Sequence, residues 1–288
     1  MKNLFLFSIL YLTLFCSYKL PAQSRTGIYI GGGTSWYYGD MNDRTLTHES
    51  LFRYYFNGGV NYKISNRVDV NANFTYAKIV GADSLAIQKF NLKRNLSFYS
   101  DVYEGSLLFN FRFWYLRTFN PYIIAGAGYM KFNPMVDFNN EAIELQPLGT
   151  EGQFISEGNY PNPYKLYSLT APLGLGLEII LTKALSMRLE FMNHFTFTDY
   201  LDDVSGAYAD STKLGATPNG ALAVELASNK SNGYPAEGKG RGNPNNNDNF
   251  ATFGVTVVYR MVNNNTRSNH GVIGKKRSNK KHKCPAYN

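Results

Sequence analysis

The chain is poor in cysteine and has no long apolar runs beyond its N-terminal segment. It has two cysteines in 288 residues, and Cys16 falls inside the N-terminal segment, so Cys284 is the only cysteine beyond it. A single cysteine cannot form an intramolecular disulfide, and none is expected to support the fold. No later stretch reaches the roughly 18 apolar residues of a membrane helix. The choice is therefore between a β-barrel in a membrane and a soluble fold.

The N-terminal segment, residues 1–22, is typical of a secretory signal peptide. Lys2 precedes an apolar run from Leu4 to Phe15, and Ala22 supplies a small residue near a cleavage point. The residues before Cys16 are Thr-Leu-Phe, which disfavours a lipoprotein anchor. We expect an exported protein whose folded domain covers residues 23–262.

Positive charge is concentrated in a tail, residues 263–288. The net charge is +8, and the tail has no acid but seven cations: Arg267, Lys275, Lys276, Arg277, Lys280, Lys281 and Lys283. The rest of the chain is close to neutral, which argues against a nucleic-acid-binding core. We expect a disordered periplasmic tail that binds an acidic periplasmic protein, or the peptidoglycan and lipid surface. The alternative is a tail that only solubilises the protein.

Apolar and polar residues alternate with a period of two, which predicts strands. The 22 tyrosines, 20 phenylalanines and 26 glycines also favour strands and tight turns over helices. Eight segments show the pattern, although the glycine-rich fifth has less distinct faces: 27–38, 52–64, 68–77, 99–115, 121–132, 166–181, 187–198 and 250–262.

The connections between these segments alternate between short and long. They are short after the second, fourth and sixth segments and long at about 39–51, 82–98, 133–165 and 199–249. Short periplasmic turns, long external loops and an even strand number are typical of outer-membrane barrels. We predict an all-β, eight-stranded antiparallel transmembrane barrel with both termini periplasmic. Aromatic girdles at the membrane interfaces are expected from Trp36, Tyr38, Phe52, Tyr54, Tyr62, Tyr115 and Tyr200. A soluble barrel or sandwich, with its apolar face inward, is the alternative.

In such a barrel the polar face of each strand points into the lumen. An eight-stranded barrel is filled by side chains, and isolated buried charges are costly, so the charges should pair and close the pore. The predicted lumen network is Arg53, Lys63, Asp69, Glu104, Arg112, Glu178, Arg188, Glu190 and His194, with Arg260 on the same face. An open conducting pathway is the alternative.

Three acids, Asp199, Asp202 and Asp203, follow the seventh segment. Asp202 and Asp203 could take hydrogen bonds in a turn or cap, or all three acids together with Ser205 could bind calcium, although their spacing matches no EF-hand loop. A catalytic role would pair His194 with Asp199 or Ser205. There is no nucleophile elbow and no metal-ligand spacing, so we expect no enzyme, no cofactor and no small-molecule substrate.

Several motifs carry a resemblance to a known family. They are "TDYLDDVSGAY" at 198–208, "YxGD" at 37–40, "AQ" at 22–23, and the run from Arg241-Gly-Asn-Pro through Asp248 to Phe250. The chain resembles the PorG-like outer-membrane proteins of the type IX (Por/gliding) secretion system of the Bacteroidetes. The resemblance covers most of the domain. It implies a small, non-catalytic outer-membrane barrel that works with a periplasmic ring of a lipoprotein and its partner, the PorK/PorN-like proteins. A structural or passive porin-like barrel outside that system is the alternative.

Overall fold

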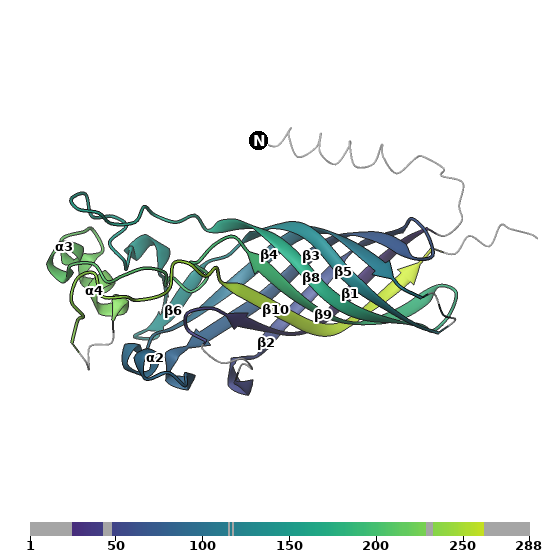
Figure 1. Ribbon diagram of the computed structural model, residues 1–288, viewed down its shortest axis with the longest axis horizontal. Helices are drawn as coiled ribbons and strands as arrows, with labels where there is room; N and C mark the ends of the chain where they lie inside the picture. Colours follow the sequence, from purple (N-terminus) through teal and green to yellow (C-terminus); the bar gives the residue numbers. More distant parts are fainter. Residues whose placement is uncertain (1–24, 43–47, 115, 117, 229–232, 262–288) are drawn as a thin grey trace, which may run out of the picture. The chain divides into compact units, whose positions relative to one another are not determined.

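The computed structural model describes residues 25–42, 48–114, 116, 118–228 and 233–261 (Figure 1). The predicted signal peptide, the basic tail and Tyr115 lie outside the described residues. In the described part of the chain, no helix is both long enough and apolar enough to cross a membrane.

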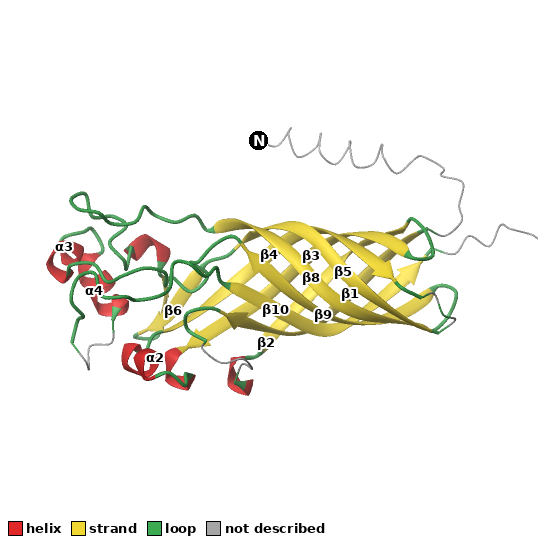
Figure 2. Ribbon diagram, in the orientation of Figure 1, coloured by secondary structure: helices red, strands yellow, loops and turns green. Residues whose placement is uncertain are grey.

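Eight long strands form the closed antiparallel barrel that the sequence predicts (Figure 2). Each is hydrogen-bonded to two neighbours in the order β3-β2-β1-β10-β9-β8-β5-β4, and the pairing of β3 with β4 closes the ring. The strands are β1 (Thr26–Tyr38), β2 (Arg53–Lys63), β3 (Val68–Ala82), β4 (Ser97–Arg112), β5 (Phe119–Lys131), β8 (Tyr167–Ile180), β9 (Leu185–Thr196) and β10 (Asn249–Arg260).

The apolar face of the barrel points outward and the polar face inward. On β4, Leu107 and Phe109 are 56% and 53% exposed, whereas Glu104 and Asn110 are buried. The same alternation recurs on β3, β9 and β10. A soluble barrel would show the reverse arrangement, so the soluble alternative is wrong and the architecture is that of a transmembrane β-barrel.

Two bands of aromatic side chains ring the outer wall. Towards the long loops, Tyr76 contacts Tyr54 and Tyr103 at ring-centroid distances of 6.0 and 5.2 Å, and Tyr129 contacts Tyr167 at 5.9 Å. Trp36 lies 5.3 Å from Phe52 in the same band. Towards the short turns, the second band contains Phe111, Phe113, Trp114 and Tyr62. From Tyr103 to Phe113, a strand tilted by about 40° rises about 25 Å, which matches the apolar band of an outer-membrane barrel.

The long loops are folded, which the sequence did not predict. The strand pair β3–β4 continues beyond the Tyr76–Tyr103 band, and β6 (Pro134–Phe138) and β7 (Glu141–Glu144) form a hairpin beside β4. The helices are η1 (Glu49–Leu51), η2 (Asp83–Leu85), α2 (Lys89–Arg94), η3 (Gln146–Leu148), α3 (Ser211–Gly215) and α4 (Gly220–Ala227). Figure 1 shows α3 and α4 beyond the loop end of the barrel. Leu145, Leu201 and Leu214 are buried in the loops and give this region an apolar core. The same core continues into the loop end of the barrel lumen.

One predicted girdle residue lies elsewhere. Tyr200 stacks on Tyr164 in the loop region, with centroids 4.3 Å apart and rings 7° from parallel. It follows β9 after the strand has ended, so the period-two pattern no longer fixes the direction of its side chain.

Candidate functional site

The centre of the lumen holds a compact cluster of paired charges. Arg112 contacts both Asp69 and Glu178, with 2.9 Å between Arg112 Nη2 and Glu178 Oε2. Arg188 bridges the same two acids, with 3.1 Å from its Nη2 to Asp69 Oδ2 and 3.6 Å from its Nε to Glu178 Oε1. Arg260 also contacts Glu178. Apart from the partly exposed Arg260, these side chains are 1–2% exposed.

A third acid balances the three arginines. Glu190 accepts hydrogen bonds from the hydroxyls of Tyr122, at 2.6 Å, and Thr256, at 2.9 Å. The Tyr122 ring lies 5.4 Å from the Arg112 guanidinium and 5.8 Å from that of Arg188. Gly176 makes room for this ring, since a Cβ there would lie 2.2 Å from it. The charges therefore cancel inside a packed interior.

His194 lies in the lumen nearer to the loops. Its Nδ1 is 2.9 Å from Glu104 Oε2 and its Nε2 is 3.3 Å from the Thr252 hydroxyl. The ring stacks on Phe250 at a centroid distance of 4.2 Å and is fully buried. Both ring nitrogens are therefore engaged by Glu104 and Thr252, and not by Asp199 or Ser205 as the catalytic alternative requires.

Two of the predicted lumen residues lie at the ends of β2. Arg53 is half-buried and donates from Nη1 to the carbonyls of Ser50 and Phe52. Lys63 is half-buried at the turn end, where it pairs in register with Asp69. Arg53 thus belongs to the mouth of the barrel rather than to the central cluster, because the lumen there opens towards the loops.

The loop end of the barrel is covered by a second cluster, built around Arg94 and Arg241. Arg94 binds Asp83 through Nε and Nη2, each at 2.7 Å, and donates to the carbonyls of Asp40 and Arg241. Arg241 contacts Glu151 at 3.1 Å and Asp203 at 3.5 Å. These contacts tie all four long loops together. We call this cluster the loop latch.

Three of the four sequence motifs quoted for the family resemblance meet beside the loop latch, while the "AQ" at 22–23 lies outside the described residues. The Tyr37 hydroxyl lies 2.7 Å from both Asp202 Oδ2 and Asp248 Oδ1. Gly39 is required there, because a Cβ would lie 1.8 Å from Asp248 Oδ1. Asp40 Oδ2 accepts from the Asn243 backbone N–H at 2.8 Å. Segments more than 150 residues apart therefore form one buried arrangement.

The contact between Tyr37 and the two carboxyl groups needs an extra proton. A phenol has one hydrogen to donate, so two flanking carboxylates cannot both accept it. Burial raises the pKa of Asp202 and of Asp248 well above the usual value, and the neighbouring Asp202 charge adds to the effect at Asp248. At least one of the two is therefore a neutral acid that donates within the group.

The acidic cluster predicted at the loop base is divided between different partners. Asp202 accepts from Tyr37 and from the Val204 N–H at 2.8 Å, while Asp203 accepts from Thr150 at 2.5 Å and Tyr164 at 2.6 Å. No group of acids, histidines or cysteines among the described residues is arranged to hold a metal ion. The hydrogen-bonding interpretation fits Asp202 and Asp203, whereas both carboxyl oxygens of Asp199 are buried without a hydrogen-bond partner within 3.5 Å.

Asp199 gives a testable pH dependence. Burial raises its pKa to about 7, partly offset by the Ser205 hydroxyl. The folded protein then keeps a proton on Asp199 that the unfolded chain releases above about pH 4, so this residue's contribution to stability falls as pH rises from about 4 to 7. Asp199→Asn should therefore flatten the pH dependence of the hydrogen-exchange protection factors of the loops, which already divide out the intrinsic exchange rate, and raise those factors at pH 8. The exposed Glu157→Gln is the control; equal profiles for the two variants would contradict the assignment.

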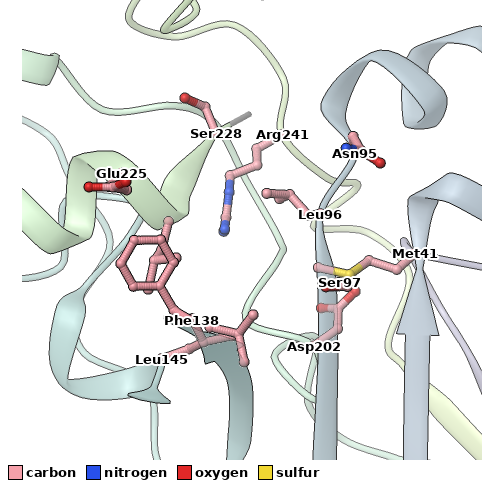
Figure 3. A pocket seen from close by; sticks show the side chains of 12 residues that line it. Met41, Asn95, Leu96, Ser97, Phe138, Leu145, Asp202, Glu225, Ser228 and Arg241 are labelled. Atoms are coloured by element: carbon pink, nitrogen blue, oxygen red, sulfur yellow. The ribbon is translucent and has the colours of Figure 1, made fainter. Parts of the chain in front are cut away.

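A cavity of about 280 Å³ lies beside the loop latch (Figure 3). Its lining is divided between apolar side chains, such as Met41 and Leu96, and polar ones, among them Asp202, Glu225 and Arg241. Figure 3 shows Arg241 extending between Ser228 and Leu96.

The sequence reasoning missed Tyr122, Arg94 and Arg241. Tyr122 stands at an inward position of β5, the segment whose two faces were indistinct in the sequence. It lies two residues before the buried Ile124, and this spacing was the one signal that it faces the lumen. Arg94 and Arg241 lie in loops, where no periodicity applies; only the Arg241-Gly-Asn-Pro motif pointed to one of them.

No family model matches the chain, and no curated protein matches it in sequence. Among solved structures, the attachment invasion locus protein Ail of Yersinia pestis is 10% identical, with a TM-score of 0.38 over 83% of this chain and 100% of Ail. Neisserial surface protein A is 9% identical, with a TM-score of 0.39 over 83% and 98%. A major outer-membrane protein of Thermus thermophilus is 10% identical, with a TM-score of 0.39 over 82% and 99%. At these low scores the fold assignment rests on the chain's own closed strand order.

Proposed function

We propose that this chain is a closed, non-enzymatic barrel of the bacterial outer membrane and a fixed component of the type IX secretion machinery. The closed-barrel part of this proposal rests on one observation. The outer wall is apolar, whereas the lumen is filled by side chains of opposite charge that pair with one another. An apolar band of about 25 Å between two aromatic girdles suits a membrane. A lumen blocked by Arg112, Arg188 and their acids suits an anchor better than a channel.

The secretion role rests on the resemblance to the PorG-like family. Three of the motifs that carry this resemblance supply residues at or beside the loop latch, which supports a shared architecture at the loop end of the barrel. In the proposed orientation the short turns face the periplasm and the long loops face the cell exterior. The turns and the basic tail would then contact the periplasmic ring of PorK/PorN-like proteins.

The two tryptophans provide a test of membrane insertion. Trp36 lies in the loop-side girdle and Trp114 in the turn-side girdle, both on the outer wall. In lipid vesicles, lipids brominated at shallow depth should quench both residues more strongly than lipids brominated at the acyl-chain ends. Single-tryptophan variants, Trp36→Phe and Trp114→Phe, separate the two signals. If no brominated lipid quenches either tryptophan, the membrane placement is contradicted. A separate measurement tests the lumen: stepwise ion currents in planar bilayers would contradict a closed lumen.

Deletion of the gene tests the secretion role. Cargo proteins that carry the C-terminal signal of the type IX system should accumulate inside the cell, or gliding should fail, and a plasmid copy should restore both. Normal export and gliding in the deletion strain would favour the passive barrel instead.

A further inference from the structure

A lysine interrupts the loop-side tyrosine girdle. The register places Tyr76 opposite Tyr103, Tyr103 opposite Lys131, and Lys131 opposite Tyr167, so these four residues form a row across β3, β4, β5 and β8. Lys131 is exposed on the outer wall, between two tyrosines. Its alkyl stem can lie along the apolar wall while its ammonium group reaches the polar side of the girdle.

A second lysine lies just above the first. Lys165 is exposed two residues before Tyr167, and the ladder continues past the strand through a 3.0 Å bond from the Phe132 N–H to the Leu166 carbonyl. This pairing makes Lys131 and Lys165 diagonal neighbours on adjacent strands. At that separation, one anionic group can contact both ammonium groups at once.

Neither ammonium group has a hydrogen-bond or ion-pair partner among the described residues, and acids stand on β4, β6 and β7. These acids are engaged by neutral donors: Asp101 accepts from the Tyr76 hydroxyl at 2.8 Å, Asp137 from Tyr99 at 3.3 Å, and Glu144 from Asn133 at 3.0 Å. The two lysines therefore keep their charge available for a ligand outside the protein.

We propose that Lys131 and Lys165 bind the phosphate headgroup of an anionic lipid in the leaflet that faces the long loops. The proposal rests on the membrane placement given under Proposed function. The site lies at headgroup depth on the lipid-facing wall, and the Tyr129–Tyr167 pair below it offers an apolar surface to the lipid body. Lysines near a membrane surface attract anionic lipids with a strength that adds up per residue.

The test measures the affinity of the full mature chain for phosphatidic acid. Native mass spectrometry in neutral detergent counts the lipid molecules bound during a titration. Phosphatidylcholine, which has no net charge, is the comparison lipid. The double variant Lys131→Gln/Lys165→Gln should bind phosphatidic acid about 30-fold more weakly. The control Lys183→Gln, in the exposed turn between β8 and β9, should bind as the unmodified chain does. A heat-modifiable gel band verifies that each variant forms the barrel.

Three results would overturn the proposal. They are an unchanged affinity in the double variant, an equal preference for phosphatidylcholine, and displacement of the lipid by millimolar inorganic phosphate, which would indicate a general anion site. None of them affects the membrane placement, since tryptophan quenching tests that separately. Failure of quenching would instead remove the proposed function along with its lipid site.

Discussion

Replacing Arg188 with alanine should lower the free energy of unfolding of the barrel by about 3–5 kcal/mol. Arg188 is 1% exposed and contacts both Asp69 and Glu178. Without it, two buried carboxylates share one fewer cation, and the removed side chain leaves a gap beside Tyr122. Urea unfolding in lipid vesicles, followed by the heat-modifiable gel band, measures the change.

Two variants define how this result should be interpreted. Lys183→Ala, in the exposed turn, should change stability by no more than about 0.5 kcal/mol. Arg188→Met keeps most of the volume but not the charge, so it separates the lost ion pairs from the lost packing. If Arg188→Ala costs no more than Lys183→Ala, the lumen cluster does not stabilise the barrel.

The barrel and most of its interior could be predicted because a strand alternates its faces strictly. Once the apolar face of β9 is assigned to lipid, Arg188, Glu190 and His194 must point inward, and the structure places all three in the lumen. Parity does not indicate depth along the barrel axis. That is why Arg53, at the end of β2, has the inward parity but lies at the mouth.

The folded loops could not be predicted in the same way. Their contacts join segments far apart in the chain, such as Tyr37 with Asp248 and Arg94 with Asp40, and they follow no period. Apolar residues such as Leu201 and Leu214 were the only local sign that the loops bury a core. The quoted motifs marked the right residues, but their sequence alone did not indicate that they meet.

Replacing Arg241 with alanine should release the loops while leaving the barrel intact. Arg241 is buried, contacts Glu151 and Asp203, and donates from Nε to the Ala227 carbonyl at 3.3 Å. Its loss leaves two buried carboxylates without their cation, at a local cost of about 3–5 kcal/mol. Because the barrel strands are held by their own ladders, this cost should appear as local opening rather than global unfolding.

Hydrogen exchange distinguishes local opening from global unfolding. In Arg241→Ala, amides at 145–155 and 199–228 should exchange faster by a factor of about 100 or more, while those of β4 and β9 keep their protection. Protease added outside vesicles should cut these loops and leave a heat-modifiable barrel fragment. Lys239→Ala, exposed two residues away, should show neither effect. Arg241→Lys should open the loops partially, because an ammonium group keeps the charge but cannot bind Glu151, Asp203 and Ala227 with one planar fork. Uniform loss of protection in the loops and strands together would mean that the loop latch and the barrel unfold as one unit, and the two clusters would then have to be treated as a single core.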